Sequence, residues 1–311
     1  MGASGPIRYV SGLKGTYPRE LRQHFTPMPR IVLITNDSKH GQRVLDTVWK
    51  RGILLDAVLF ITGSVGLPAA RGGSFSGRLA RWPRAAGAAV KRRIFFHRER
   101  KAGYAARCTR VMATGAINSR RMLRDLRALA PEWILLGGGG IVAPEVIATA
   151  GTGVLNAHPA LLPWIRGTGV VGAALEHGVP LGATLHSVDR GIDTGAVIER
   201  RLLRVAVEDT DLATLELRCW ELAAELMADA VEAIARGQVP AGAPQSMRYP
   251  LFRWPTAEEM DRHVALAAAG RAHELYRAWL PLCVDAERGV LPRGDFGAPA
   301  TLDLPPAAAR G

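Results

Sequence analysis

The stretch "RIVLITNDSKHGQRVLDTVWKRGILLDAVLFITG", residues 30–63, decides the fold. Its first part, 30–37, is an apolar run that ends in polar residues, which predicts a buried strand. The middle part, 38–52, has apolar residues at helical spacing and ends in a glycine, which predicts a helix. The apolar run at 54–63 predicts a second strand. A strand, a helix and a strand in this order favour a parallel sheet.

The rest of the chain continues the same alternation. Residues 63–104 are rich in Gly, Ala and Arg and show the least regular pattern, and Asn118 or Ser119 is a good N-cap for the helix that follows. Further strands are predicted at 109–114, 131–141, 151–159, 182–188 and 196–205, and helices at 118–129 and 209–238. We therefore expect an α/β fold, with an open, mostly parallel, twisted sheet that has helices on both faces.

Three segments are predicted along the chain. An N-terminal extension covers residues 1–29, the core covers 30–237, and a short, partly helical C-terminal extension covers 238–311. In the last segment the only strong helical pattern is at 256–280, and the final dozen or so residues have the composition of a disordered tail.

Composition limits the function classes. The chain has 311 residues, of which 48% are hydrophobic, enough for a sizeable core. No apolar run approaches the roughly 18 residues that suggest a membrane span, and the first residues lack the apolar segment of a secretory signal. The three cysteines are far apart and have neither zinc-site nor disulfide-framework spacing. These features predict a cytoplasmic protein without a metal site and without a membrane partner.

Positive charge is concentrated in one window. The net charge is +12, and between Arg78 and Arg127 there are 15 Lys or Arg against two acids, so this window alone contributes +13 (15 − 2). Such a window attracts anions, including nucleic acid, phosphates and carboxylates. A solvated arginine-rich loop is the other interpretation, and composition leaves both open.

Two polar residues end the strand predicted at 151–159. In "NAHPALLPWIRGTG", residues 156–169, Asn156 and His158 stand two positions apart, so in an extended strand they point the same way. Pro159 then biases His158 towards an extended conformation. A rigid histidine beside an amide suits acyl chemistry, with the histidine handling a proton and the amide binding an oxyanion. An Asx-type turn beside a packed histidine is the structural alternative.

A second segment follows closely. "GATLHSVDRGIDTGAVIERR", residues 182–201, contains Asp193 between two glycines that let the backbone approach a ligand. A carboxylate near an imidazole fixes its orientation and favours its charged form. Asp189 is a turn candidate, and His186 is left open between a packed strand histidine and a site residue. Asn156, His158 and Asp193 would form a proton-handling site with no metal and no covalent nucleophile.

Together the two segments resemble the folate-dependent formyltransferase family. The family pattern is Asn-x-His, Pro-small-Leu-Leu-Pro and Arg/Lys-Gly, followed by Gly-x-Thr-x-His and Asp-Thr-Gly; the chain has "NAHPALLPWIRG" and then "GATLHSVDRGIDTG". The resemblance covers about residues 30–237. It implies a Rossmann-like core in which Asn156, His158 and Asp193 are catalytic, and it places "GGGGIVAPEVI" where the family's folate-contacting loop lies.

The resemblance also implies a reaction. A formyl group would pass from 10-formyltetrahydrofolate to an amine through a tetrahedral oxyanion intermediate. The candidates for binding the cofactor are Gly138, Gly139, Gly140, Ile141, Val142 and Asp189. The candidates for binding the substrate are Arg166, Gly167 and Thr168.

Within the family, the expected acceptor is a small-molecule amine, and an anionic one would suit the basic window. Methionyl-tRNA formyltransferases resemble this core but have a C-terminal barrel domain, whereas the tail here is dominated by one helical pattern. The hydrolase that acts on formyltetrahydrofolate resembles it too, but has an N-terminal regulatory domain, for which 29 residues are too few. Both remain alternatives, and a homo-oligomer is left open.

Two other classes of protein are alternatives. A dinucleotide-dependent Rossmann enzyme is disfavoured because the first strand–helix junction has no GxGxxG motif, and Pro144 follows the glycine run too soon for a dinucleotide-binding helix. A nucleic-acid-binding protein could use the basic window, with Trp82, Phe95 and Phe96 stacking on bases. The catalytic motifs do not need nucleic acid, so that partner is not expected.

Overall fold

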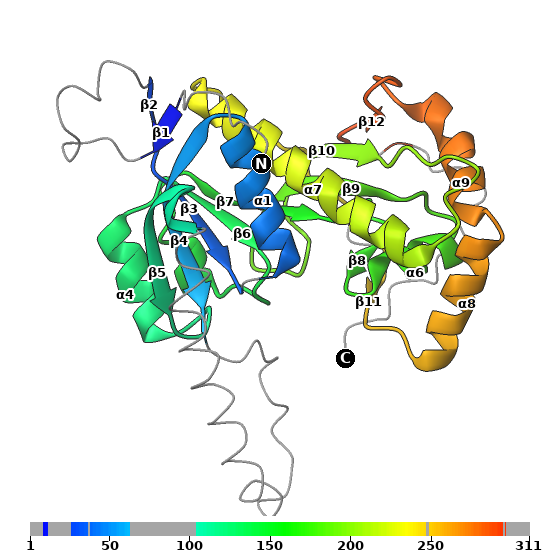
Figure 1. Cartoon of the computed structure of the whole chain (residues 1–311), viewed down its shortest axis with the longest axis horizontal. Helices are drawn as coiled ribbons and strands as arrows, with labels where there is room; N and C mark the ends of the chain where they lie inside the picture. Colours follow the sequence, from blue (N-terminus) through cyan, green and yellow to red (C-terminus); the bar gives the residue numbers. More distant parts are fainter. Residues whose placement is uncertain are drawn as a thin grey trace, which may run out of the picture. The chain divides into compact units, whose positions relative to one another are not determined.

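The structure is a computed structural model that describes residues 9–11, 26–36, 38–62, 104–246, 249–294 and 296. It divides the chain into two compact units (Figure 1). The first contains the described residues up to Val154 together with Ala235–Gly237. The second contains Leu155–Ile234 and the described residues from Gln238 onward. In the part of the chain that the structure describes, no helix combines the length and apolarity needed to cross a membrane.

A parallel sheet forms the centre of the first unit. In it, β6 pairs with β3, β3 with β4, and β4 with β5, all in parallel, and the fully buried residues of β3 and β6 form its core. The short strands β1 and β2 extend the sheet, because β1 pairs with both β4 and β2. The strands are β1 (Tyr9–Ser11), β2 (Thr26–Met28), β3 (Ile31–Thr35), β4 (Ile53–Ile61), β5 (Cys108–Thr114) and β6 (Trp133–Gly137).

Helices cover both faces of this sheet. The connection β3–α1–β4 and the connection β5–α4–β6 run across the sheet in opposite directions, and such connections are right-handed, so α1 and α4 lie on opposite faces (Figure 1). Each helix begins at a serine whose hydroxyl accepts a backbone N–H, Ser38 for α1 and Ser119 for α4. The helices are α1 (Lys39–Lys50), α4 (Arg120–Leu129) and α5 (Pro144–Ile147).

The main sheet strands of the second unit pair in antiparallel fashion. From residue 155 onward β7 pairs with β9, β9 with β10, and β10 with β12. A separate two-stranded ribbon joins β8 and β11 in parallel. The elements are β7 (Gly153–His158), β8 (Arg166–Gly167), α6 (Val170–Glu176), β9 (Gly182–Ser187), β10 (Val197–Leu202), α7 (Leu212–Ala235), β11 (Leu251–Phe252), α8 (Ala257–Ala268), α9 (Arg271–Trp279) and β12 (Val290–Leu291).

The C-terminal residues are built into the second unit. Trp279 of α9 is fully buried and packs edge-on against Trp164, with ring centroids 5.2 Å apart. The expectation of one helix at 256–280 is wrong. The segment is helical, but the chain breaks at Gly270 (φ +81°) into α8 and α9. The extension also contributes β11 and β12. The compact units therefore divide the chain near residue 154, while the boundary at 237 stays a prediction about the catalytic core.

The expected fold class is confirmed. The chain is an α/β protein whose described strand pairings are mostly parallel, and the strands and helices predicted up to residue 238 all appear. The short elements β1, β2, β8, α5 and α6 were not predicted, and neither were β11 and β12 of the C-terminal segment. The irregular region expected at 63–104 and the expected disordered tail lie outside the described residues, except at Tyr104, which is helical.

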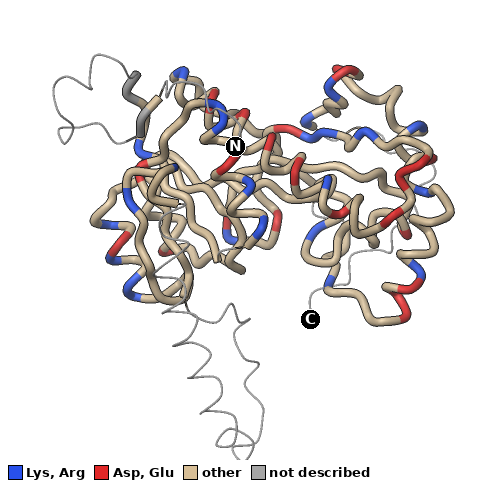
Figure 2. Tube along the Cα trace, viewed as in Figure 1, with Lys and Arg blue, Asp and Glu red and all other residues tan. Residues whose placement is uncertain are grey.

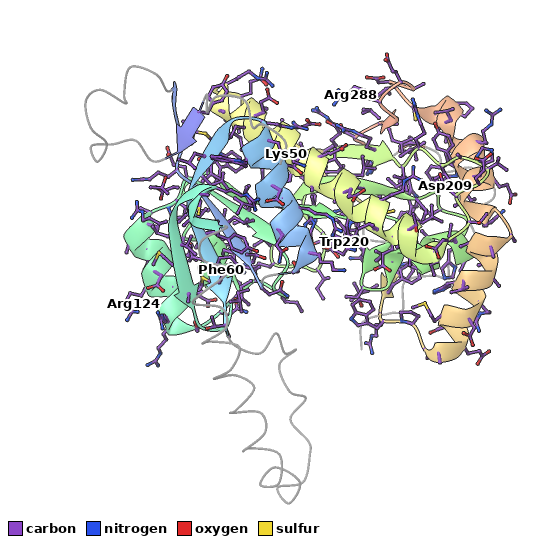
Figure 3. All side chains as sticks on the ribbon, in the orientation of Figure 1. Lys50, Phe60, Arg124, Asp209, Trp220 and Arg288 are labelled. Atoms are coloured by element: carbon purple, nitrogen blue, oxygen red, sulfur yellow. The ribbon has the colours of Figure 1, made fainter. Side chains whose placement is uncertain are left out.

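Part of the basic window is described, from residue 104 to 127. Figure 2 shows positive residues along α4, and Figure 3 shows Arg124 projecting outward from this helix. Arg107 pairs with Asp46 at 2.6 Å and Arg110 with Asp56 at 3.2 Å. These pairs neutralise part of the window within the first unit, and most of its remaining charge lies in residues 78–103, outside the described part.

Candidate active site

Strand β7 delivers the first two side chains of the site. Asn156 and His158 lie two residues apart on it, so their side chains leave the strand on the same face. Across the antiparallel ladder, Asn156 stands opposite His186 of β9, and His158 stands opposite Thr184. Directly opposed residues have neighbouring side chains, so the register of β7 and β9 brings His186 to the amide of Asn156.

Asn156 and His186 form a hydrogen-bonded pair. Nδ1 of His186 lies 2.7 Å from the carbonyl oxygen of Ser187, so it must be the protonated, donating nitrogen. In the neutral ring Nε2 then accepts a hydrogen bond from the Asn156 amide nitrogen, at 3.1 Å. Burial lowers the pKa of the His186 imidazole, although the Asp193 carboxylate opposes this shift. The neutral ring thus fixes the orientation of the Asn156 amide through one of its two N–H groups.

His158 is held between a carbonyl and a carboxylate. The ring is 5% exposed, and its Nε2 donates to the carbonyl oxygen of Ile165 at 3.1 Å. Its Nδ1 lies 3.7 Å from Oδ2 of Asp193. The other carboxylate oxygen, Oδ1, lies 3.7 Å from Nε2 of His186. The Asp193 carboxylate therefore stands between the two imidazoles, in reach of charge interactions with both.

Asp193 occupies an unusual backbone position. Its φ is +53°, in the left-handed region, where aspartate is tolerated better than most non-glycine residues. Its Oδ2 accepts the backbone N–H of Gly167 at 2.9 Å. Burial by itself raises the pKa of this carboxyl, but His158, His186 and the Gly167 N–H outweigh burial and hold the pKa below its ordinary value. The carboxylate is therefore ionised at neutral pH.

This arrangement can handle a proton and an oxyanion. The amide of Asn156 offers an oriented N–H donor, His158 offers an imidazole, and Asp193 offers a negative charge that stabilises a protonated ring. Among the described residues no group of three or more His, Cys, Asp or Glu side chains could hold a metal ion. Burial raises the pKa of the Cys108 and Cys219 thiols to about 12, so neither is a reactive thiolate.

The predicted cofactor loop lies at the carboxyl end of β6, in the first unit. Gly138, Gly139 and Gly140 all have positive φ, at +87°, +146° and +92°. Asn118 braces the loop: its amide nitrogen donates to the Ile141 carbonyl at 2.9 Å, and its amide oxygen accepts from Ala143 at 2.8 Å. Gly140 and Ile141 are exposed, while Val142 is buried. Over three residues the loop presents only backbone, and such a surface suits a flat ligand. Its role in cofactor binding stays a prediction.

Asp189 and the predicted substrate residues make contacts inside the second unit. The Asp189 carboxylate accepts the N–H of Gly191 at 3.0 Å and the Thr194 hydroxyl. Arg166 is buried and donates to the Tyr249 carbonyl at 2.6 Å. The Thr168 N–H donates to the Phe252 carbonyl at 3.2 Å. These residues thus shape the two loops that meet at Asp193, and their contact with a ligand stays a prediction.

Two residues of the site were missed or left open by sequence reasoning. His186 contacts both Asn156 and Asp193; its signals in the sequence were the strand pattern around it and its place in the Gly-x-Thr-x-His motif, and neither assigned it a role. Gln245 donates to the carbonyl oxygens of Asp193 and Gly195, at 3.0 and 2.6 Å. No motif marks Gln245, because its role depends on a contact 52 residues away in the chain.

The fold is α/β, and the candidate site brings an amide, an imidazole and a carboxylate close together. Residues 82–231 match a family described as formyl transferase. This segment contains Asn156, His158 and Asp193 with both of their sequence motifs. Residues 82–231, a little under half of the chain, therefore resemble the formyl transferase family.

Relatives of known name agree with this resemblance. A methionyl-tRNA formyltransferase from Paraburkholderia phymatum is 35% identical over 146 residues, which are 46% of this chain and 43% of that protein. One from Caldanaerobacter subterraneus is 32% identical over 124 residues, 39% of this chain and 40% of that protein. The chain thus matches about two fifths of the length of these relatives. The crystal structure of a 4-N formyltransferase from Francisella tularensis has the same fold, with a TM-score of 0.50 and 14% identity over 76% of this chain and 87% of that one.

Proposed function

We propose that this protein is an N-formyltransferase that moves a formyl group from 10-formyltetrahydrofolate to an amine of a small molecule. The observation that carries the proposal is the meeting of Asn156, His158 and an ionised Asp193 in a segment that resembles the formyl transferase family. The bound folate would supply an activated formyl group, and the residues of the chain would supply orientation, charge and proton control.

Each member of the trio has a distinct role in the proposal. As the acceptor amine attacks the formyl carbon, negative charge develops on the formyl oxygen, and the N–H of Asn156 that His186 leaves available donates to it. Because Nε2–H of His158 is bound to the Ile165 carbonyl, its Nδ1 would take the proton that the amine loses, and the charged ring would stabilise the same oxygen. The proton would then pass to the folate nitrogen as its bond to the formyl carbon breaks, so that tetrahydrofolate leaves. Asp193, 3.7 Å from the His158 ring, stabilises the ring when it carries that proton. One oriented donor to an oxyanion is typically worth about 2.7–4 kcal/mol.

The donor is expected at the loop Gly138–Val142. Backbone N–H and C=O groups at the carboxyl end of a strand can pair with the polar edge of a pterin, and the positive φ angles of Gly138, Gly139 and Gly140 leave that backbone uncovered by side chains. Asp189 is the further candidate for the donor, and Arg166, Gly167 and Thr168 are the candidates for the acceptor. Resemblance to the family supports this division of roles.

A small-molecule acceptor is preferred because the C-terminal residues fold as α8 and α9 and pack into the second unit, with Trp279 in its core. An anionic acceptor would suit the charge of residues 78–127. The second candidate is transfer to methionyl-tRNA, which the names of the relatives favour. Formyl transfer to water, as in the hydrolase, is the third.

One experiment separates these candidates. The protein is incubated with 10-formyltetrahydrofolate and, in parallel, with nucleotide-sugar amines, amino acids, hydroxylamines or initiator methionyl-tRNA, while release of tetrahydrofolate is followed. Acceptor-dependent release with a small amine supports the proposal. Release with methionyl-tRNA alone supports the second candidate, and equal release without any acceptor supports the hydrolase. No release under any condition contradicts formyl transfer.

A further inference from the structure

The side chain of Gln245 reaches into the loop that carries Asp193. Its amide nitrogen lies 3.0 Å from the carbonyl oxygen of Asp193 and 2.6 Å from that of Gly195. Both partners can only accept hydrogen bonds, so the amide nitrogen must face them. Gln245 lies beyond residue 231, where the match to the formyl transferase family ends. A residue outside the matched segment thus contacts the backbone of a catalytic candidate.

The contact falls on a segment whose conformation needs support. Asp193 has a φ of +53°, which a non-glycine residue holds only where the surroundings impose it. At Gly195 the chain passes so close to Ser187 that a Cβ atom would collide with the Ser187 carbonyl oxygen. The Gln245 amide binds the carbonyls on either side of Thr194 and so fixes the direction of both peptide planes.

The residues around Gln245 also hold the opposite side of the site. Ala243 exchanges two backbone hydrogen bonds with Val197, at 2.8 and 2.7 Å. Further along, β11 pairs with β8, and β8 contains Gly167, whose N–H donates to the Asp193 carboxylate. One stretch of the C-terminal segment therefore anchors the backbone of Asp193 through Gln245, and the residue that binds its carboxylate through β11.

We propose that Gln245 is a positioning residue that holds the Asp193 carboxylate in place between His158 and His186. Ala243, Gln245 and strand β11 are then part of the active site. The inference deepens the proposed function and rests on it. Gln245 itself touches no substrate in this scheme; it acts through the backbone of Asp193.

Loss of the amide has two expected consequences. The Asp193 loop relaxes, so the carboxylate moves away from the His158 ring. Even a small displacement of a group in an active site lowers turnover steeply. The Gly167 hydrogen bond to the carboxylate weakens as well, and since that bond lowers the pKa of Asp193, the pKa rises towards its ordinary value. The acid limb of the kcat–pH profile then shifts to higher pH.

The test compares Gln245→Met with Thr256→Ala. Methionine has nearly the volume of glutamine but no amide, whereas Thr256 is the N-cap of α8, whose hydroxyl accepts the Glu259 N–H at 3.2 Å, away from the Asp193 loop. Gln245→Met is expected to lower kcat about tenfold or more with KM for the donor nearly unchanged, and to shift the acid limb upward. Thr256→Ala is expected to lower the melting temperature and leave kcat and the pH profile as they are.

A second readout does not depend on activity. The imidazole NMR signals of His158 and His186 report the position of the carboxylate 3.7 Å from each ring. Both sets should move in Gln245→Met and stay in place in Thr256→Ala. Unchanged signals with unchanged kcat in Gln245→Met, or an equal loss of kcat in Thr256→Ala, would overturn the inference. If the wild-type protein transfers no formyl group, the proposed function fails, and the NMR comparison still decides the role of Gln245.

Discussion

Two loops of this protein hold the chain at positive φ, and they do so with opposite means. The loop after β6, in the first unit, uses three successive glycines, Gly138 to Gly140, with φ between +87° and +146°. The loop after β9, in the second unit, holds Asp193 at φ +53°. The first loop has no side chains over this stretch, and the second keeps a carboxylate there.

Packing accounts for Gly138 and Gly139 but not for Asp193. A Cβ atom on Gly139 would lie 2.5 Å from the Ile61 side chain, and one on Gly138 would lie 2.9 Å from the Ser38 hydroxyl. At Asp193 a glycine would relieve a backbone cost of about 1–2 kcal/mol. The chain keeps the aspartate at that cost. A strained position that retains a polar side chain therefore signals a site, whereas a glycine run signals close approach of the backbone.

The largest effect is expected where the second loop loses its charge. Asp193→Asn should lower kcat by about 100-fold or more, because the amide cannot stabilise a protonated His158. Asparagine tolerates the left-handed region, and its Oδ1 can still accept the Gly167 N–H, so the fold should remain intact. His158→Ala and Asn156→Ala should lower kcat by a similar factor. Single-turnover formyl transfer and circular dichroism measure both properties.

The matched control for this substitution is Asp209→Asn. Asp209 belongs to the same unit and pairs with Arg218 at 2.6 Å, away from the imidazoles. Its replacement should leave kcat unchanged. Near-full turnover in Asp193→Asn, or an equal loss in Asp209→Asn, would show that the strained aspartate has no special role.

A smaller effect is expected where the first loop gains a side chain. Gly140 is exposed and has φ +92°, so Gly140→Ala introduces strain of about 1–2 kcal/mol into the proposed folate loop. If folate binding needs the native backbone there, the Kd for 5-formyltetrahydrofolate should rise about tenfold, the factor that corresponds to 1.4 kcal/mol. Isothermal calorimetry measures the change.

Gly237→Ala is the control for strain alone. Gly237 has φ +79° at the end of α7, and a Cβ atom there would meet no atom within 4 Å. This variant should lose stability and bind the folate as the wild type does. Equal affinities in both variants would remove the first loop from the folate site.

Local patterns predicted some parts of the site and missed others. Asn156 and His158 could be found because the two-residue period of a strand is local, and Asp193 because its flanking glycines and its motif are contiguous. His186 acquires its role only through its register opposite Asn156, which a single strand does not reveal. Gln245 acts across 52 residues and has no local signal.

The same holds for the fold: elements with a local sequence pattern were predicted, and elements that depend on distant contacts were not. The longer strands and helices of residues 30–237 have clear periodic patterns, so they were predicted. The two-residue strand β8 is too short for a pattern, and it exists because β11 pairs with it. At Gly270 one glycine in a helical pattern costs only about 1 kcal/mol, so the sequence could not decide between a continuous helix and a break. In the structure the chain breaks at Gly270, and Trp279 packs against Trp164 from the separate helix α9.

The smallest expected effect is on the pH dependence of the free energy of unfolding. It should come from His186 and Asp193. His186 has a pKa below its ordinary value of 6.5 in the folded protein. Below pH 6.5 the unfolded chain therefore binds a proton that the folded protein does not, so the free energy of unfolding falls as pH drops from 6.5 towards the lowered pKa. The slope for one proton is at most about 1.4 kcal/mol per pH unit. Asp193 acts in a lower window, because its contribution is complete above its ordinary value of 3.8 and is lost as pH falls through its lowered pKa.

His186→Gln separates the two windows. Glutamine can still accept from the Asn156 amide but does not titrate, so the variant should lose less free energy of unfolding than the wild type as pH falls from 6.5, and should keep the dependence near and below pH 3.8. Asp193→Asn should show the reverse, with the upper window retained and the lower one removed. Urea unfolding at closely spaced pH values measures both. Parallel curves for the wild type and His186→Gln above pH 4 would mean that the imidazole keeps its ordinary pKa in the folded protein and takes up a proton below pH 6.5 as the unfolded chain does, so that burial does not hold the ring neutral there.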